Sequence, residues 1–450
     1  MKKNRLYSKL IILFICFLFI LSSGCANAPA KATEDVIVIY CMAASEAEVK
    51  YYINRFKDFY PDSDFAVRTF LDAREMDEVL VKELNVGIGP DIVIFNDETE
   101  LDVLRMAKNG AFLSLDEKIK ADDTFHPEKY IATALMAGRA DGRQYLLPLT
   151  FTIPLVMYDA DSDLGFTPAP VISHADFMAA VINSIENAQG ERNEGVLYVS
   201  NITGTAQTHD LISPMLFASQ ILKLSEKNKV ENFDAENIRQ VVEWLKIYRN
   251  ECYAKSKDIL DARGGHAWAI AENMKYYYSY ASFDIIRNIW LFNSCYGYAD
   301  IDHFRVSAFR EIGAGNVTAM LKSYGVIGND AHPLAYEFLR IAMDTFLASA
   351  HGNFASSVNI ANMELMLATC TWGPNFRRLP DGSVFAEKPL DEPLMDWIRR
   401  IFLSIDKVII PNMKLDSIFR DSFTAYFENE KSYEDCANAF IQKLNLYLSE

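Results

Sequence analysis

The side chains that most often carry catalysis do not form a recognisable catalytic motif in this sequence. There is no Gly-x-Ser-x-Gly turn, no His-Glu-x-x-His zinc pattern and no Gly-x-x-x-x-Gly-Lys-Ser/Thr phosphate loop. The seven histidines are scattered, and His209-Asp210 indicates a helix start rather than part of a triad, although triad members can be distant in sequence. We therefore expect a protein that is not an enzyme, with no cofactor.

A group of aromatic residues close together in the sequence could bind a ligand. It comprises Trp268, Tyr276, Tyr277, Tyr278 and Tyr280. If the segment is a helix, four tyrosines in five positions cannot all face its core, because only positions three or four apart share a face. An exposed ring can stack on the apolar C–H face of a sugar. A tyrosine can also bind a metal ion as a phenolate. Because the phenol pKa is near 10, only a hard, highly charged cation would drive the loss of its proton.

Charge and cysteine content exclude two further classes of protein. The chain has 44 Lys and Arg against 61 Asp and Glu, a net charge of −17, whereas a nucleic-acid binder needs clustered positive charge. Besides Cys25, five cysteines lie beyond the N-terminal segment, widely spaced and with no Cys-x-x-Cys pair, so we expect no metal site. They are Cys41, Cys252, Cys295, Cys370 and Cys436.

The N-terminus has the pattern of an exported protein. Four basic residues precede an apolar stretch at residues 10–21, which as a helix spans about 18 Å, short of a bilayer core of about 30 Å. The sequence Leu21-Ser22-Ser23-Gly24-Cys25 resembles a bacterial lipobox. We expect residues 1–24 to be a signal peptide, Cys25 to be lipidated, and residues 25–34 to tether the protein to the extracellular face of the cell membrane. The alternative is an ordinary cleaved signal with a chance cysteine.

Strand and helix patterns alternate after this segment. We predict strands at 36–40, 65–70 and 91–95, and helices at 75–84, 97–109 and after a capping box formed by Ser45 and Glu48. This alternation predicts a parallel sheet covered by helices, with ligands at the carboxyl ends of its strands, here residues 41–45 and 96–99.

The remaining chain is predicted from the same periodicities. Residues 150–305 are mostly helical by pattern, with the best stretches at 176–187, 215–225 and 235–248. Two short strands follow at 306–309 and 324–327, then a helix at 333–347 and a last helix from Ser432.

Short motifs in collinear order resemble the extracellular solute-binding proteins of ABC importers, the family that includes maltose-binding protein. None is specific alone, but together they cover nearly all of the chain after residue 34. They are the Phe-x-x-x-x-Pro close of a helix at 56–61, Gly-x-Gly-Pro-Asp-Ile-Val at 87–93, Ala-Lys-x-Gly…Leu-Asp at 107–116, Asp-Gly-Arg-x-Tyr-x-x-Pro at 141–148, and segments 332–339 and 442–450.

The resemblance implies an α/β, two-lobe periplasmic-binding-protein-like fold of type II. By analogy, lobe one comprises residues 35–149 and 307–348, and lobe two residues 150–306 and 349–450. Hinge crossings would fall near 150–154, 306–309 and 347–352, with the ligand cleft between the lobes.

The resemblance also implies a function. The protein would be the lipid-anchored, monomeric binding component of an ABC importer, capturing a small solute, here expected to be a carbohydrate, by closure of the lobes and delivering it to the permease subunits. Two alternatives stay open: a binder of ferric ion or another non-sugar solute, and a ligand-sensing surface lipoprotein that partners a membrane receptor.

Ligand contacts are implied at positions that match family contacts: Met42, Phe95, Asn96, Asp97, Tyr276, Tyr277 and Trp372. Each has a structural alternative. Asp97 fits the N-cap of a helix, Phe95 fits core packing, and Trp372 fits surface or inter-lobe packing. Residues 40–42 stand where sugar binders often have Trp, which counts against a sugar.

Overall fold

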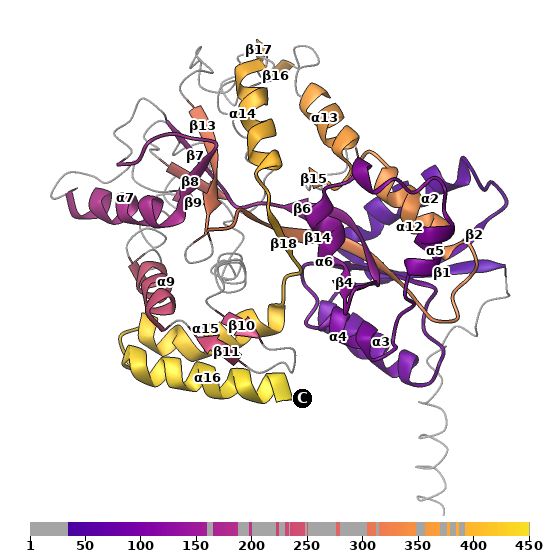
Figure 1. Cartoon of the computed structure of the whole chain (residues 1–450), viewed down its shortest axis with the longest axis horizontal. Coiled ribbons are helices and arrows are strands. Elements are labelled where there is room, and N and C mark those ends of the chain that lie inside the picture. The colour runs from indigo at the N-terminus through magenta and orange to yellow at the C-terminus, as the bar shows by residue number, and fades with distance from the viewer. Residues whose placement is uncertain are drawn as a thin grey trace, which may run out of the picture.

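The computed structural model describes residues 35–159, 165–187, 198–199, 222–224, 230–233, 235–247, 250, 276–279, 304–311, 315–347, 356–369, 376–378, 384–386 and 392–449. They form two parts, each built on its own β-sheet, with strands running between them (Figure 1). The predicted signal peptide, the tether with Cys25, and Trp372 lie outside the described residues.

The first sheet has seven strands in the order β15-β6-β14-β3-β1-β2, with β18 also paired to β14. Strand β1 is parallel to β2 and β3, whereas β14 is antiparallel to both β3 and β6. The three strands predicted at the start of the chain are therefore confirmed as neighbours in one sheet. The strands are β1 (Val36–Met42), β2 (Asp64–Phe70), β3 (Ile92–Asn96), β6 (Leu146–Thr152), β14 (Thr318–Ile327), β15 (Ser356–Ser357) and β18 (Lys407–Ile409).

Helices cover this sheet, and the hydrophobic core of the first part includes residues from most of them. They are α2 (Glu46–Lys57), α3 (Ala73–Asn85), α4 (Val103–Lys108), α5 (Asp116–Ala121), α6 (Ala132–Ala137), α12 (Ala335–Asp344), α13 (Ile360–Thr369) and α14 (Glu392–Leu403). Short 3-10 turns η1 (Ala43–Ser45) and η2 (Pro127–Lys129) and the small hairpin β4 (Arg139–Ala140) and β5 (Arg143–Gln144) complete the connections.

The second sheet has five strands in the order β8-β13-β7-β12-β9. These are β7 (Leu155–Asp159), β8 (Val171–Ser173), β9 (Tyr198–Val199), β12 (Tyr276–Ser279) and β13 (Phe304–Arg310). Its core includes residues of the helices α7 (His174–Asn187), α9 (Ala235–Ile247), α15 (Met413–Phe427) and α16 (Tyr433–Ser449). Two short pairs lie apart from both sheets: β10 (Leu222–Leu224) with β11 (Val230–Phe233), and β16 (Phe376–Arg378) with β17 (Val384–Ala386).

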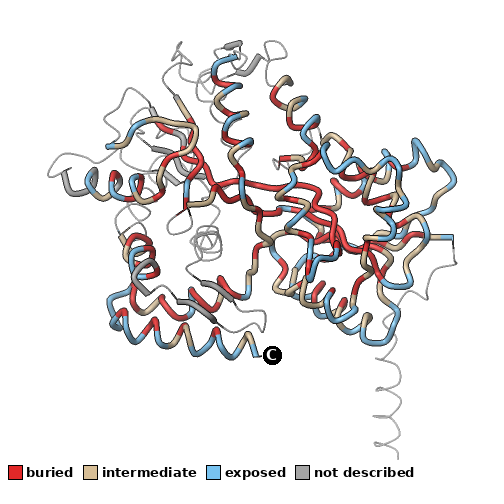
Figure 2. The backbone as a smooth tube through the Cα atoms, viewed as in Figure 1, coloured by how far each residue is buried: buried red, intermediate tan, exposed pale blue. Residues whose placement is uncertain are grey.

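Each sheet has its own hydrophobic core. Figure 2 shows buried positions following the central strands of both sheets and one face of the helices around them. In the second core, aromatic rings of α15 pack on α16, as between Phe419 and Phe440, whose centroids are 5.6 Å apart. Because burial of apolar surface is the main driving force of folding, two cores indicate two structural units.

The chain passes between the two units at three described places. Strand β6 continues through Ile153 and Pro154 into β7, β13 leads into β14, and β18 leads into α15. At the second crossing, Asp406 accepts a hydrogen bond from the Val317 amide (2.9 Å). The buried Glu311, which follows β13, faces His174 Nδ1 at 3.1 Å. These two contacts pair polar groups at the second crossing, whereas the buried Thr318 hydroxyl beside it has no hydrogen-bond partner among the described residues.

The predicted lobe boundaries differ from these pairings. Residues 150–152, expected in lobe two, belong to β6 of the first sheet, and residues 307–310, expected in lobe one, belong to β13 of the second sheet. The expected crossing at 306–309 lies within β13, and the chain leaves the second sheet only beyond Arg310. Residues 349–450 were expected in lobe two, but β15 and β18 pair with the first sheet, and α14 packs in the first core. Within residues 349–450, the described residues whose side chains are buried in the second core lie at 413–449. They belong to α15 and α16, which pack against α9.

Three local predictions are also corrected. The helix expected at 97–109 starts only at Val103, because Asp102 is its N-cap and accepts a hydrogen bond from the Arg105 amide (3.0 Å). The tyrosine segment is not a helix: Tyr276–Ser279 is strand β12. Residues 222–224, expected in a helix, form strand β10.

The capping box expected at Ser45 and Glu48 is absent. Ser45 has helical backbone angles and its side chain caps nothing, because the turn η1 runs directly into α2. The Glu48 carboxylate has other hydrogen-bond partners.

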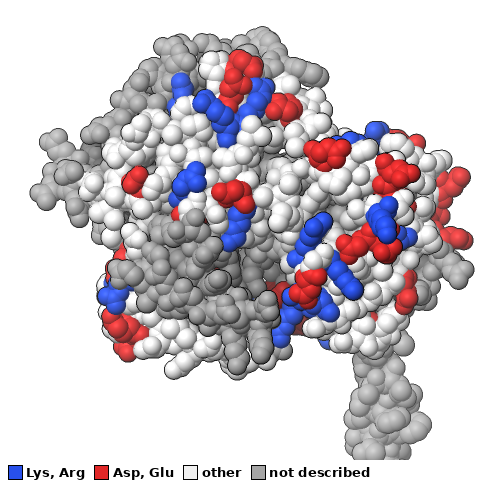
Figure 3. Space-filling view, in the orientation of Figure 1, with Lys and Arg blue, Asp and Glu red and all other residues white. Residues whose placement is uncertain are grey.

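The described surface carries both signs of charge, and Figure 3 shows acidic and basic side chains side by side on the face it displays. On α14, for example, Arg399 pairs with Glu392 and Asp396 at 2.8 and 2.6 Å. None of the helices in the described part of the chain has the length and apolar character that crossing a membrane requires.

Candidate functional site

The carboxyl ends of β1, β2 and β3 meet at one edge of the first sheet, because these strands are parallel. Residues after these ends form the turn η1, the segment 71–72 and the loop 97–102. Strand β14 passes the same edge, since Ser323 pairs with Asn96 at the end of β3. We treat this edge as the candidate site and call it the lobe-one edge.

The centre of the lobe-one edge is an ion pair between Lys322 and Asp97. The Lys322 ammonium lies 2.6 and 2.8 Å from the two carboxylate oxygens, and the side chains are 47% and 23% exposed. Lys322 is the exposed position in an otherwise buried ten-residue strand. The register between β14 and β6 departs at Ser323 alone and is the same on both sides of it, so the pairing directly beside Lys322 is locally irregular.

The loop that carries Asp97 is held by a buried carboxylate on α3. Asp77 accepts hydrogen bonds from the Thr99 hydroxyl and the Glu100 amide, both at 2.9 Å. The Asn96 side chain accepts one from the Glu98 amide at 3.1 Å. Burial raises the pKa of Asp77 to about 6. The loop is thus fixed by contacts within lobe one.

Leu71 is an exposed apolar residue on the same edge. It follows β2 directly and is 90% exposed, the highest value among the exposed large apolar side chains of the described chain. Its neighbour Phe70 pairs in register with Met42 at the end of β1. Sequence reasoning missed Leu71, although it lies between a strand end and the N-cap Asp72 of α3, where parallel sheets commonly bind ligands.

Three of the residues expected to contact ligand are buried. Met42 is 2% exposed at the end of β1 and Asn96 is 6% exposed at the end of β3. Phe95 has no exposed surface and stacks on Tyr324, with ring centroids 5.6 Å apart. The structure therefore places Phe95 in the core rather than on the edge. Asp97 is not the N-cap of a helix, because its carboxylate is paired with Lys322.

The tyrosines lie in the second sheet. Strand β12 lies between β7 and β9, with Tyr276 and Tyr277 paired to Tyr158 and Met157. The side chains of β12 are outside the described part of the structure, so contacts of Tyr276 and Tyr277 with a ligand stay predictions, as do those of Trp372. In the part of the chain that is described, no three His, Cys, Asp or Glu side chains are grouped to hold a metal ion.

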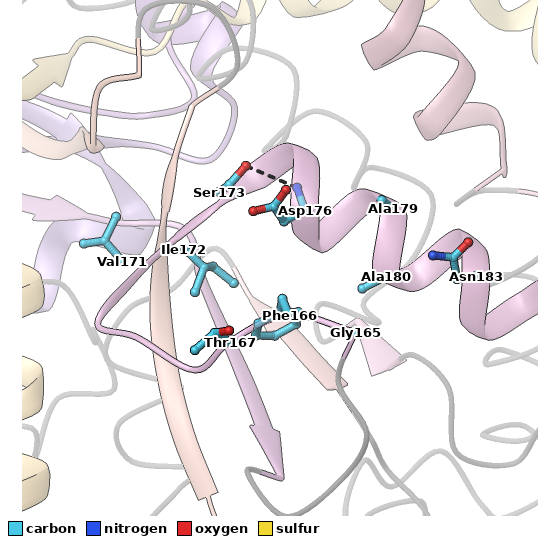
Figure 4. Close-up of a pocket in the computed structure, with 10 residues that line it drawn as sticks. All are labelled: Gly165, Phe166, Thr167, Val171, Ile172, Ser173, Asp176, Ala179, Ala180 and Asn183. Carbon is cyan, nitrogen blue, oxygen red and sulfur yellow. Dashed lines mark hydrogen bonds between the residues drawn. The ribbon is translucent and has the colours of Figure 1, made fainter.

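A pocket of about 420 Å³ lies in the second unit, between the start of α7 and the segment before β8 (Figure 4). Ser173 accepts a hydrogen bond from the Asp176 amide at 3.2 Å, so this amide of the first turn is already paired. Aliphatic and small residues such as Ile172 and Ala180 line most of the rest. Thr167, Asp176 and Asn183 add polar side chains, so the lining of the pocket is mixed.

Comparisons of the whole fold find many similar solved structures. The sugar-binding protein MalE from Xanthomonas citri superposes with a TM-score of 0.65 at 13% identity, over 92% of this chain and 97% of that one. A sugar transporter protein from Rhizobium etli in an open conformation gives 0.60 at 15% identity, over 91% and 98%. An ABC substrate-binding protein from Listeria monocytogenes in complex with cycloalternan gives 0.54 at 15%, over 92% and 99%.

At this level of identity the similarity establishes the fold. The chain has the two-lobe, type II fold of extracellular solute-binding proteins, as the sequence motifs predicted. No protein-family model matches the chain, and no curated protein matches it by sequence.

The buried carboxyl of Asp77 should give a defined pH dependence of stability. Because its pKa is about 6 in the folded protein and lower in the unfolded chain, the folded state binds this proton more tightly. Its stabilising contribution is complete below about pH 4 and is lost as the pH rises through about 6. The unfolding free energy of the wild type should therefore fall relative to that of Asp77→Asn between pH 4 and 7.

Urea unfolding at pH 4, 5, 6 and 7 measures this difference. Glu78→Gln, on the same helix with a largely exposed side chain, controls for the loss of one negative charge. A constant difference between wild type and Asp77→Asn across the range would contradict the assignment.

Proposed function

We propose that the protein captures a carbohydrate outside the cell between its two lobes and delivers it to an ABC permease. The observation that carries the proposal is a two-lobe fold whose first lobe presents a charged pair and an exposed leucine at the carboxyl ends of its parallel strands. Similar solved structures support the solute class, since they include complexes with cycloalternan, mannotriose and mannobiose.

The side chains at the lobe-one edge suit a neutral polyhydroxylated ligand. The Asp97 carboxylate can accept hydrogen bonds from hydroxyls and the Lys322 ammonium can donate them. Because each charge already faces its opposite, the pair does not favour an anionic ligand over a neutral one. Leu71 can cover the apolar C–H face of a sugar ring. A site of this kind binds and orients a ligand without changing it, so we propose a binding protein rather than an enzyme.

Closure of the lobes explains how binding becomes a signal for transport. Three chain segments connect the units, and ligand contacts from both units favour the closed arrangement over the open one. Tyr276, Tyr277 and Trp372 remain the proposed contributors from the second lobe and its surroundings. We further propose that lipid on Cys25 anchors the protein to the outer face of the cell membrane, as a monomer, close to its permease.

A thermal-shift and scattering experiment tests the proposal. A chain starting at Ala26 is mixed with mannotriose, maltose, amino acids, polyamines or ferric citrate. A ligand at 100 times its Kd stabilises the fold by about 2.7 kcal/mol, which raises the melting temperature clearly. We expect a shift with at least one oligosaccharide and a smaller radius of gyration in its presence. If only ferric citrate shifts the melting temperature, or if none of the compounds does, the carbohydrate assignment is contradicted.

Loss of either charge at the lobe-one edge should weaken binding. Lys322→Met and Asp97→Asn each remove a charged hydrogen-bonding group, so we expect Kd for the oligosaccharide identified above to rise at least about tenfold, or about 1.4 kcal/mol. Isothermal titration measures the change. Lys50→Met, which removes a lysine of an exposed pair on α2, is the control. Equal affinity in all three variants would remove Asp97 and Lys322 from the site.

Leu71 should contribute apolar contact rather than folding stability. Because its side chain is almost fully exposed, Leu71→Ser should leave the urea midpoint nearly unchanged and raise Kd by about tenfold. Leu446→Ser, an exposed leucine on α16, is the matched control and should change neither quantity. Unchanged binding by the Leu71 variant would show that the end of β2 does not reach the ligand.

A further inference from the structure

Glu48 is a buried acidic residue that neither the fold nor the proposed ligand contacts explain. It lies in the first turn of α2 and is 6% exposed. Burying a carboxyl without partners is unfavourable, so its hydrogen bonds indicate its role. It does not cap α2, as shown above.

Its carboxylate is the end point of a chain of hydroxyl groups. The oxygen Oε1 accepts hydrogen bonds from the Tyr52 hydroxyl at 2.5 Å and from the Ser323 hydroxyl at 3.1 Å. Ser323 lies in turn 2.7 Å from the Thr150 hydroxyl. Since Ser323 donates to Glu48, Thr150 donates to Ser323. The chain of hydroxyl groups therefore links α2 to β14 and β6, which are two of the strands of the first sheet that connect to the second unit.

Ser323 stands where the register of β14 against β6 shifts and follows Lys322 directly. Where the pairing of a strand is irregular, the backbone ladder alone does not fix it, so a side-chain contact at that point helps to decide where the neighbouring residue points. On its other side Ser323 pairs with Asn96, the residue before Asp97. The Glu48–Ser323 hydrogen bond thus holds the part of β14 that places both members of the charged pair.

We propose that Glu48 is a positioning residue, whose hydrogen bond to Ser323 fixes this irregular part of β14 so that Lys322 meets Asp97 at the lobe-one edge. The ligand-binding consequence rests on the proposed function, whereas the positioning itself does not. Glu48 acts through Ser323 and touches no ligand.

Two hydroxyl deletions separate this role from a general structural one. Ser323→Ala and Tyr52→Phe each remove one donor to the same oxygen of Glu48, but only Ser323 is on β14. We expect Ser323→Ala to speed amide hydrogen exchange of residues 321–324 at least tenfold relative to residues 325–327. Tyr52→Phe should leave that ratio unchanged. Exchange on the unliganded protein, read by nuclear magnetic resonance, measures both.

Substitutions of Glu48 complete the test. Glu48→Met should reproduce the Ser323→Ala effect, and Glu48→Gln should restore the wild-type ratio, because one amide oxygen can still accept both hydroxyls. Glu83→Met is the matched control: Glu83, on α3, accepts from the Tyr40 hydroxyl at 2.7 Å and pairs with Arg68 of β2 at 3.0 Å. If Glu48→Met does not fold, the pair of hydroxyl deletions still decides. Equal exchange ratios in Ser323→Ala and Tyr52→Phe would overturn the proposal.

The binding readout distinguishes this inference from the proposed function. With mannotriose as probe, Ser323→Ala should raise Kd at least about fivefold and Tyr52→Phe less than twofold. If the wild type does not bind mannotriose or any other oligosaccharide, the proposed function is wrong. The exchange ratios then still test whether Glu48 positions β14. If the wild type binds, and Ser323→Ala changes neither exchange nor Kd, the function stands and the role of Glu48 is wrong.

Discussion

Strand β14 is the constraint on which the architecture of the first lobe depends. It is paired on one side with β3 and on the other with β6, and its first residues also pair with β18. A strand inside a sheet must satisfy its backbone groups on both sides, so its position fixes the strands around it. Because β14 also follows the crossing from the second unit, one strand determines the register of the sheet, the end of the crossing and the place of Lys322. A small displacement of β14 would therefore move residues both at the lobe-one edge and at the crossing from the second unit.

The opposite end of the same sheet shows that a family-like motif can serve the fold alone. In the segment Gly87-Ile88-Gly89-Pro90-Asp91, the Asp91 carboxylate accepts hydrogen bonds from the Val38 amide at 2.7 Å and the His332 amide at 2.6 Å. It thereby joins the start of β1 to the loop after β14, far along the chain from both. Gly87 has a positive φ of 72°, which favours glycine, and a Cβ at Gly328 would lie 2.5 Å from the Pro90 carbonyl oxygen. The motif closes the end of the sheet that is opposite to the candidate site.

The sequence was informative where local pattern and tertiary structure agree. Strands β1, β2 and β3 and helices α3, α12 and α16 follow from apolar spacing, and the collinear motifs predicted the two-lobe fold. The segment 97–109 was predicted too long because Asp97 and Asp102 are equally good caps by type, and only the Lys322 contact separates them. Strand β12 was not predicted, because four tyrosines in five positions, three of them in this strand, show neither the alternation of a strand nor the spacing of a helix. Lys322 could not be found from sequence, since it is 225 positions from Asp97 and no Gly or Pro marks the irregular pairing beside it.

The energetics of the charged pair argue that it is present for binding rather than for stability. An ion pair as exposed as Lys322 and Asp97 contributes little to folding, because solvent screens the charges and ordering a long lysine side chain costs entropy. The pairing of β14 with β6 is irregular beside Lys322, and Asp77 holds the facing loop although its own charge is disfavoured by burial. Ordering the Lys322 side chain and burying Asp77 therefore both cost free energy, for an ion pair that adds little to stability. Such a cost is offset if the pair is held ready for a ligand, because contacts fixed before binding lose less entropy when the ligand arrives.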